Sequence, residues 1–253
     1  MKISEFDYHL PEELIAQEPS KIRDECRLLA VNKTSKTFED KIFKDIIDYL
    51  KPGDVLVRNN TKVIPARLFG HKEQTNAHVE VLLLHQIQGD VWECLCGNAK
   101  PIKVGSVIDF KDGLLKAKCL EVKEEGIRIM EFIYDGIFME ILNEIGNMPL
   151  PPYIKKQCED NDRYQTVYAK ILGSAAAPTA GFHFTDELFD KIKKMGVTVV
   201  DVTLHIGLGT FKPVKEKDVD NHKMHTEHYE MSQETADILN KAKEENRRII
   251  AIG

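Results

Sequence analysis

Histidine, glycine and threonine residues lie at the end of one apolar run of the sequence. The run, residues 197–206, reads V-T-V-V-D-V-T-L-H-I and leads into a loop that contains Gly207, Gly209 and Thr210. A helical pattern precedes it, so helix, strand and glycine-rich loop follow in the order of an α/β unit. Because ligands bind at the carboxyl ends of strands in such units, we expect His205 and this loop at the mouth of a site. The alternative is that the glycines only make a turn and that His205 is a core histidine with satisfied hydrogen bonds.

The stretch of residues 173–185, just before this unit, is built from unusually small residues. It reads G-S-A-A-A-P-T-A-G-F-H-F-T. Its alanines and glycines leave room for a flat ligand or a second backbone, while Pro178 and Gly181 prevent a continuous helix. Thr185 is expected to cap the helix that follows, since the N–H groups of a first turn lack partners. A plain core segment would carry bulkier residues, so we interpret this stretch as the part around which a site is built.

A second polar group follows an apolar strand predicted at residues 55–57. Polar residues at the end of a strand are placed as binding residues often are. Asparagine and threonine at such positions serve equally well as turn and capping residues, and this alternative stays open. The group consists of Arg58, Asn59, Asn60, Thr61 and Lys62.

Histidine and carboxylate side chains also occur close together at His222, His225, Glu227 and His228. These residue types are common metal ligands, so a metal-dependent hydrolase is one interpretation. The spacing argues against it, because a strand at residues 226–231 would point His225 and His228 to opposite faces. The zinc-protease pattern, with Glu directly after the first His, is also absent from the sequence. We therefore expect no metal.

The composition argues against a protein that coats nucleic acid through bulk charge. The chain has 253 residues, 42% of them hydrophobic, and a net charge of −6. A local basic patch on an acidic protein can still hold one structured RNA. The sequence contains no pattern of a membrane helix or a signal peptide, so a cytoplasmic location is expected. The odd number of cysteines, 5, indicates reduced thiols rather than a disulfide framework.

The pattern of apolar runs and turns divides the chain into two kinds of predicted structure. Residues 67–134 hold short apolar runs separated by turns, at the spacing of a small all-β barrel. The flanking segments alternate between strand and helix patterns, and a helix is expected to begin near Pro11. We predict an α/β fold: a large mixed α/β domain from residues 1–66 and 149–253, interrupted by an inserted β-barrel domain at residues 67–148. Substrates often bind in the cleft that such an arrangement creates.

Several strings of residues, taken in order, resemble one known family. They read V-I-P-A-R-L-F-G, M-P-L-P-P-Y-I, R-Y-Q-T-V-Y-A, A-A-P-T-A-G-F-H-F-T, V-T-L-H-I-G-L-G-T-F-K-P-V and H-K-M-H-T-E-H-Y-E. Together they make the chain similar to the S-adenosylmethionine:tRNA ribosyltransferase-isomerases of queuosine biosynthesis. The resemblance covers residues 6–253.

The resemblance implies a transferase-isomerase that acts on tRNA. The family moves the ribosyl part of S-adenosylmethionine onto the aminomethyl group of a deazaguanine at the wobble position of certain tRNAs. The base becomes epoxyqueuosine, and adenine and methionine are released. Neither a metal nor a cofactor beyond the substrate S-adenosylmethionine is implied, and we expect a monomer.

The reaction implies roles for residues in the matching strings. The sulfonium acidifies the neighbouring carbon, so a base must remove a proton there, and adenine leaves more readily when its ring is protonated. Candidates for base and acid, not assigned individually, are His183, His205, His225 and Glu227. RNA contacts are expected from Lys62, Arg163 and Tyr164, because RNA readers stack splayed bases on aromatic side chains. Substrate contacts are expected from Arg58, Asn59, Asn60, Thr61, Arg67, Ala177, Pro178, Thr179, Gly181, Phe182, Gly207, Gly209 and Thr210.

Two parts of S-adenosylmethionine suggest more specific contacts. The methionine carboxylate favours an arginine fork, for which Arg58 and Arg67 are the candidates. The small-residue stretch is expected to seat adenine, where Phe182 or Phe184 would stack on it. Packing of these two phenylalanines in the core is the alternative.

Two departures from the family pattern limit what carries over. The family reads N-D-T where this chain has Asn59, Asn60 and Thr61, so an amide stands in the place of a carboxylate. If that carboxylate were the essential base, activity would be badly reduced. The sequence also ends at A-I-G where family members continue, which suggests a fragment or a short form. The competing interpretation is a noncatalytic module that still binds tRNA or an adenosyl ligand.

Overall fold

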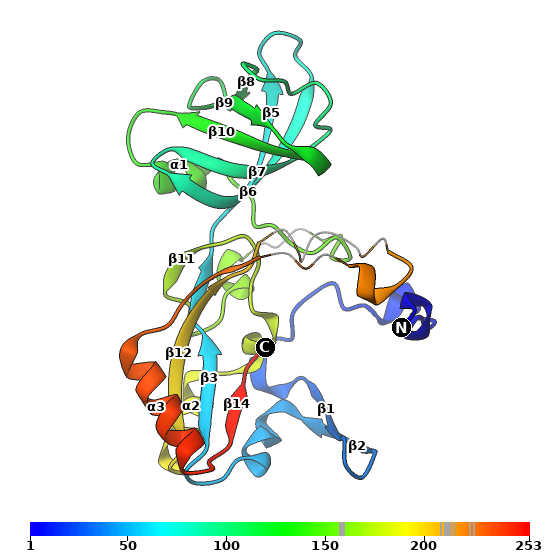
Figure 1. The fold of residues 1–253 in the computed structure, drawn as a ribbon, viewed down its shortest axis with the longest axis vertical. Coiled ribbons are helices and arrows are strands. Elements are labelled where there is room, and N and C mark those ends of the chain that lie inside the picture. The colour runs from blue at the N-terminus through cyan, green and yellow to red at the C-terminus, as the bar shows by residue number, and fades with distance from the viewer. Residues whose placement is uncertain (157–159, 208, 210–213, 215, 223, 225) are drawn as a thin grey trace.

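A closed β-barrel stands above a mixed α/β region, and the chain passes between the two in both directions (Figure 1). The computed structural model describes residues 1–253 with the exception of 157–159, 208, 210–213, 215, 223 and 225. The barrel is built from the middle of the sequence, while both ends of the chain lie in the α/β region. The predicted fold class, a mixed α/β fold interrupted by a small β-barrel, is confirmed. The domain boundaries at residues 67 and 148 stay predictions.

The barrel closes because its strands pair around a ring in the order β10-β7-β6-β5-β8-β9. Alternate side chains point inward, as in β7, where Trp92, Cys94 and Cys96 are buried. Helix α1 (Phe138–Ile145) packs Leu142 against the same interior. The strands are β5 (Arg67–Lys72), β6 (His78–Gln88), β7 (Val91–Gly97), β8 (Val107–Phe110), β9 (Leu115–Val122) and β10 (Ile127–Ile133).

The cysteines of the described residues are free thiols, as the sequence predicts. Burial raises the pKa of the Cys96 thiol to about 12. A thiol with such a pKa holds almost no thiolate at neutral pH and is a poor nucleophile. Cys94 and Cys96 therefore act as small apolar residues of the barrel core.

A sheet in the order β13-β12-β3-β14 forms the centre of the α/β region. Strands β12, β3 and β14 are parallel, and β13 pairs antiparallel with β12. Helices α2 and α3 cover opposite faces of the sheet, since α2 packs near Leu56 and α3 packs near Val55. Because β3 and β12 are parallel, their polar carboxyl ends meet at one edge. The bounds are β3 (Val55–Asn59), β12 (Thr198–His205), β13 (His228–Glu230), β14 (Ile249–Ala251), α2 (Asp186–Lys194) and α3 (Gln233–Glu244).

Side-chain caps fix where α2 and α3 begin. The Thr185 hydroxyl oxygen accepts the N–H of Leu188 at 3.1 Å, which confirms the cap predicted from the sequence. Ser232 caps α3 in the same way by accepting the N–H of Thr235 at 3.1 Å. Among the described residues, each helix is too short or too polar to span a lipid bilayer.

The prediction of an N-terminal helix beginning near Pro11 is wrong. Residues 12–14 form only a single 3-10 turn, η2 (Glu12–Leu14), and Leu14 is 71% exposed. A short helix needs an apolar face packed on the protein, and this one would have had none. The other 3-10 segments are η1 (Ile3–Phe6), η3 (Arg23–Glu25), η4 (Phe43–Tyr49), η5 (Glu124–Gly126), η6 (Asn161–Tyr164), η7 (Thr179–His183) and η9 (Val219–Asn221).

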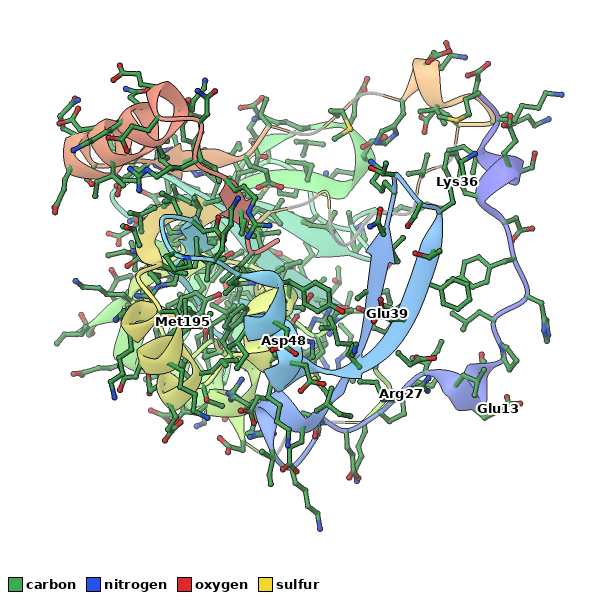
Figure 2. The ribbon with its side chains drawn as sticks, turned by 90° about the horizontal axis from the view of Figure 1, so that it is seen from below. Glu13, Arg27, Lys36, Glu39, Asp48 and Met195 are labelled. Atoms are coloured by element: carbon green, nitrogen blue, oxygen red, sulfur yellow. The ribbon has the colours of Figure 1, made fainter. Side chains whose placement is uncertain are left out.

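Two smaller pairings complete the α/β region. Strands β1 (Arg27–Asn32) and β2 (Thr37–Ile42) form an antiparallel hairpin that stands to one side of α2, with Lys36 at its turn (Figure 2). Strand β4 (Thr61–Val63) pairs parallel with β11 (Ile171–Ser174). The second pairing brings the small-residue stretch beside the chain that leads into the barrel.

Replacing Asp54 by Asn is expected to lower the free energy of unfolding by about 1–3 kcal/mol. Asp54 is 1% exposed, and its carboxylate accepts from Arg248 Nε at 2.9 Å and from the Lys51 N–H at 2.8 Å. The Arg248 hydrogen bond is the largest cause that lowers the Asp54 pKa. The stabilisation is therefore present above the unfolded pKa of about 3.9 and is lost as the pH falls through the lowered folded pKa. Urea unfolding at pH 7 and pH 3 measures it, and an equal difference between parent and variant at both pH values would contradict the assignment.

Candidate functional site

Asn59 joins the carboxyl ends of β3 and β12 into one rigid edge. Its amide nitrogen donates to the Leu204 carbonyl at 2.9 Å, and its amide oxygen accepts the N–H groups of Leu204 at 3.0 Å and Thr61 at 3.1 Å. The side chain is 6% exposed. Asn59 therefore holds the backbone of Leu204 and Thr61 in place, and its buried side chain is used in these bonds rather than in contact with a substrate.

His205 lies on this edge, at the end of β12. Its Nδ1 is 2.8 Å from the Thr61 hydroxyl oxygen, which holds the ring in one orientation. The ring lies against Gly173, where an added Cβ would come within 2.9 Å of it. The half-buried ring is thus fixed by a hydroxyl on one side and by a glycine backbone on another.

Burial is the main cause that lowers the pKa of His205, and the neighbouring His228 lowers it further. A histidine with a lowered pKa is neutral at pH 7 and can accept a proton. His205 therefore has the protonation state that a general base requires.

Glu227 reaches the same edge from the segment before β13. Its Oε2 accepts the N–H of Gly207 at 2.7 Å. The small-residue stretch joins from the other side, where the Ser174 hydroxyl accepts the N–H of Ile206 at 2.9 Å and the Ala175 N–H donates to the Ile206 carbonyl at 3.0 Å. The structure thus brings together the predicted residues His205, Gly207 and Glu227. Gly209 is partly buried in the loop beyond them, whereas Thr210 and His225 lie outside the described residues.

The sequence did not predict that two more histidines approach His205. His228 pairs with His205 across β12 and β13, and their rings lie nearly parallel with centroids 5.9 Å apart. His85, on barrel strand β6, follows at 6.4 Å from His228, and Glu230 Oε1 is 3.1 Å from His228 Nε2. The sequence contained one indication of the position of His228, because a strand was expected at residues 226–231. Nothing in the sequence pointed to His85, because its contact depends on how the barrel sits on the α/β region.

His183 lies in different surroundings from His205. Its Nδ1 is 2.9 Å from Cys26 Sγ, and its ring centroid is 5.1 Å from that of Phe43. Burial is the main cause that lowers its pKa. The described catalytic candidates are therefore divided between the strand edge, with His205 and Glu227, and a thiol–imidazole pair of Cys26 and His183 beside Phe43.

The two predicted carboxylate-binding arginines both have acidic partners. Arg58 Nε donates to Asp201 Oδ1 at 2.5 Å, and its guanidinium lies over the rings of Tyr168 and Phe189 at 4.6 and 4.7 Å. Arg67 Nε is 3.1 Å from Glu80 Oε1 at the start of the barrel. Arg58 is thereby packed into the α/β region, while Arg67 is partly buried at the start of the barrel.

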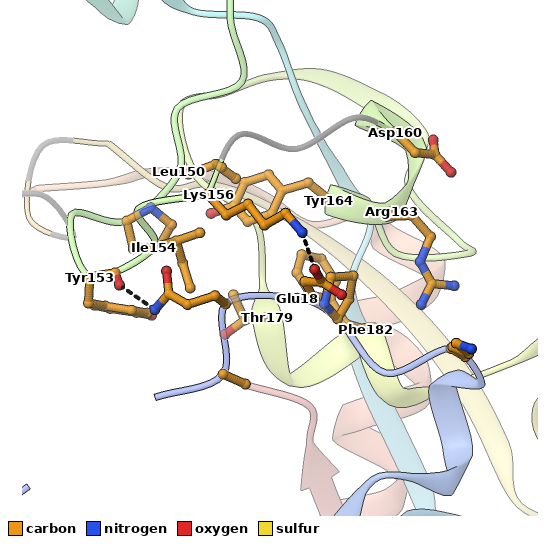
Figure 3. Close-up of a pocket in the computed structure, with 15 residues that line it drawn as sticks. Glu18, Leu150, Tyr153, Ile154, Lys156, Asp160, Arg163, Tyr164, Thr179 and Phe182 are labelled. Carbon is orange, nitrogen blue, oxygen red and sulfur yellow. Dashed lines mark hydrogen bonds and ion pairs between the residues drawn. The ribbon is translucent and has the colours of Figure 1, made fainter. Parts of the chain in front are cut away.

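A pocket of about 550 Å³ lies beside the small-residue stretch (Figure 3). One wall is the N-terminal segment, residues 16–21, and the opposite wall is residues 150–156, which return from the barrel. The predicted residues Thr179 and Phe182, from η7, and Arg163 and Tyr164, from η6, face the same space. The size is that of pockets that hold small-molecule ligands.

Hydrogen bonds hold the N-terminal wall in place. Gln17 Nε2 donates to the Tyr153 carbonyl at 3.0 Å, and Lys156 forms an ion pair with Glu18 (Figure 3). Arg23 donates to the Phe182 carbonyl at 3.0 Å and to the Asp162 carbonyl at 3.2 Å. Sequence reasoning missed this wall, because the segment is polar and its role depends on contacts with residues more than a hundred positions away.

The remaining predicted residues surround the pocket and the strand edge. Tyr164 is 8% exposed, packs with Ala177 and Phe182, and lines the pocket. Pro178 and Gly181 are buried in and beside η7. Lys62 is partly buried on β4. Phe184 is 3% exposed and stacks on Phe189 with centroids 4.9 Å apart, which favours the core alternative for this residue.

Asn60 takes part in the backbone network of the sheet. Its amide oxygen accepts the Thr203 hydroxyl at 2.7 Å, and its N–H donates to the Val202 carbonyl at 2.9 Å. A carboxylate in this place would accept the same bond from Thr203. The amide therefore keeps the geometry but not the charge of a carboxylate.

In the part of the chain that the structure describes, the residues of the histidine cluster do not form a metal-binding site. No group of three or more His, Cys, Asp or Glu side chains there is arranged to hold an ion. His222 Nδ1 instead lies 3.2 Å from Glu216 Oε2.

Comparisons with known proteins agree with the resemblance seen in the sequence. A family model described as queuosine biosynthesis protein matches residues 3–253. S-adenosylmethionine:tRNA ribosyltransferase-isomerase from Staphylococcus epidermidis is 56% identical over 253 residues, which is 100% of this chain and 74% of that protein. The protein of the same name from Staphylococcus haemolyticus is also 56% identical, with the same coverage of 100% and 74%. The crystal structure of an S-adenosylmethionine tRNA ribosyltransferase from Thermotoga maritima is 34% identical and covers 98% of this chain and 69% of that chain, with a TM-score of 0.43.

The family match extends over nearly the whole chain, including the strand edge around His205 and the residues that line the pocket. This chain belongs to the queuosine biosynthesis protein family.

Proposed function

We propose that this chain transfers the ribosyl group of S-adenosylmethionine to the aminomethyl-deazaguanine base at the wobble position of tRNA and isomerises it. Epoxyqueuosine, adenine and methionine are the products. The 56% identity to enzymes of this activity over the entire chain carries the proposal. The pocket and the fixed, neutral His205 supply what the reaction needs, a small-molecule site and a base.

The pocket beside η7 is the proposed site of the adenosyl group. The Phe182 ring offers an apolar face for adenine, and it is itself held edge-on by Tyr164 at 5.4 Å. Arg163 lines the same pocket, so its guanidinium is better placed than that of Arg58 to meet the methionine carboxylate. Residues 174–182 run from the strand edge to this pocket, and the proposal requires the sulfonium end of the ligand to point along them toward His205.

His205 is the proposed base that removes a proton from the carbon beside the sulfonium. Thr61 orients the ring, and burial keeps it neutral at pH 7. Glu227 holds the Gly207 N–H and so positions the loop next to the base. We expect the protein to act as a monomer, which light scattering of the purified protein tests.

Adenine release from S-adenosylmethionine is the direct test of this function. The 253-residue chain is incubated with S-adenosylmethionine alone and with tRNA that carries the aminomethyl-deazaguanine base, and free adenine is quantified. Release that requires the modified tRNA is the expected result. Binding of tRNA or S-adenosylmethionine without any release would favour a noncatalytic binding module instead.

An Asn60→Asp variant separates two reasons for an inactive chain. If the family carboxylate were the essential base, this variant would restore release to an inactive parent. Because Asn60 bonds to Thr203 within the sheet, we expect the parent and the variant to release adenine at similar rates.

A further inference from the structure

A second, more open groove lies next to the pocket, at the place where the chain enters and leaves the barrel. Its volume is about 650 Å³. The first strand of the barrel forms one side through Arg67 and Phe69, and the returning segment forms the other through Asn147, Leu150, Lys155 and Lys156.

Backbone hydrogen bonds fix the two sides of this groove to each other. The Arg67 N–H donates to the Asn147 carbonyl at 3.1 Å, and the Asn147 N–H donates to the Arg67 carbonyl at 2.9 Å. Gly146 permits this close approach, because an added Cβ there would lie 2.2 Å from the Pro65 carbonyl oxygen. The groove is therefore a preformed feature of the fold.

The groove differs from the rest of the protein in charge. The whole chain has a net charge of −6, yet the ionisable side chains that line the groove are Arg67, Lys155 and Lys156. Among the described residues, acidic side chains outside the groove pair with them: Glu80 with Arg67, Glu12 with Lys155 and Glu18 with Lys156.

The ion pairs of the two lysines are easily exchanged for another anion. The side chains of Lys155 and Lys156 are 69% and 54% exposed, and exposed pairs of this kind contribute little to stability. The Arg67–Glu80 pair is more deeply placed, with Arg67 27% exposed, and it joins strands β5 and β6. Arg67 therefore maintains the groove, while the two lysines can turn to a ligand.

Phe69 gives the groove an aromatic face. It is 58% exposed, whereas the neighbouring Leu68 points into the barrel and is fully buried. An exposed aromatic ring beside cationic side chains is the combination with which proteins bind single-stranded nucleic acid: the ring stacks on a base and the cations meet the backbone phosphates.

We propose that this groove binds the single-stranded loop of an RNA, with a base stacked on Phe69 and backbone phosphates on Lys155 and Lys156. The proposal rests on the proposed function, and it assigns the RNA to a surface other than Lys62, Arg163 and Tyr164. The groove and the pocket share Leu150, Ile154 and Lys156. A base that leaves the stack next to the one on Phe69 would enter the pocket directly.

Binding of a fluorescent anticodon stem-loop, measured separately from adenine release, tests the groove. Phe69→Ala is expected to weaken binding about tenfold or more, since base stacking on an aromatic side chain is worth about 1–3 kcal/mol. The double variant Lys155→Gln/Lys156→Gln is expected to weaken binding and to reduce the slope of log Kd against log salt by about 0.7 for each lost phosphate. Phe69→Ala should leave the KM for S-adenosylmethionine unchanged. The lysine double variant is compared by RNA binding alone, because Lys156 also lines the pocket.

Matched variants elsewhere on the surface serve as controls. Phe38→Ala removes an aromatic side chain that is 71% exposed on the β1–β2 hairpin. Lys111→Gln removes a lysine that is 55% exposed and paired with Glu144 on the barrel. Both are expected to bind the stem-loop like the parent.

Variants of the acidic partners give an effect of opposite sign. Glu12→Gln/Glu18→Gln removes two carboxylates that compete with RNA phosphates for Lys155 and Lys156, so RNA binding should tighten several-fold at low salt. Unchanged affinity in both the Phe69 variant and the double lysine variant, in a protein whose parent releases adenine, would overturn the groove and leave the proposed function standing. Weakened binding in these variants of a protein that releases no adenine would instead support the groove and count against the proposed reaction.

Discussion

A His205→Ala variant is expected to release adenine about 10²–10⁴-fold more slowly than the parent, with its Tm within a few degrees. The ring is half-buried, and the one hydrogen bond of the ring that the structure describes joins Nδ1 and the Thr61 hydroxyl. Its removal therefore takes away a base and leaves most of the packing. Single-turnover rates with modified tRNA and thermal unfolding in parallel measure the two effects.

The controls for His205 separate proton transfer from packing. His205→Gln keeps a polar side chain beside Thr61 but cannot act as a base at pH 7, so it should be as slow as His205→Ala. His78→Ala, at an exposed position on the barrel, should match the parent. A large fall in Tm for both His205 variants, with turnover reduced only in proportion to the folded fraction, would show that His205 is a core histidine.

The pH dependence gives a second test of His205. Burial lowers its pKa, so the parent should keep its rate as the pH falls to about 6.5, the ordinary pKa of histidine, and lose it only below. Between the lowered folded pKa and about 6.5 the unfolded chain binds more protons, so the free energy of unfolding decreases as the pH falls through this window. The His205→Gln variant should lack this component of the pH–stability curve.

Gly181→Ala is expected to lower the free energy of unfolding by about 1–3 kcal/mol and the Tm by several degrees. An added Cβ would lie 2.1 Å from the Tyr168 hydroxyl oxygen and 2.8 Å from Thr166 Cγ2. Both side chains are buried, so they have little room to move. Displacement of η7 should also raise the KM for S-adenosylmethionine, because Phe182 follows directly in the chain.

A double-mutant cycle with Tyr168→Phe isolates the cause. The Tyr168 hydroxyl is buried and has no hydrogen-bond partner among the residues that the structure describes, so Tyr168→Phe alone should be nearly neutral. In the Gly181→Ala background it removes the atom nearest the new methyl group and should restore part of the lost stability. Ala180→Ser, an exposed change one position away, is the control. Strict additivity of the Gly181 and Tyr168 changes would show that the clash lies elsewhere.

Local patterns were sufficient to predict most of the elements. The apolar run before His205 is strand β12, the hydroxyl of Thr185 caps α2, and the short runs of the middle segment form the barrel. These features depend on neighbours a few residues apart, so they can be read without tertiary structure. The prediction of an N-terminal helix was wrong because a short helix depends on tertiary packing, and no other described part of the protein covers Leu14.

The sequence by itself determined the family and the fold class, and it named His205, Gly207 and Glu227 among the candidate site residues. The placement of His205 and Gly207 beside the end of β3 follows from parallel strands and a glycine loop, which are local rules. Glu227 reaches Gly207 from 20 residues along the chain, a contact that only the tertiary structure shows. Only the tertiary structure decided that Arg58 is held by Asp201, that His85 approaches from the barrel and that the N-terminal segment walls the pocket. These contacts join residues far apart in the chain, and side chains of the same type at the same local spacing would have been compatible with many other partners.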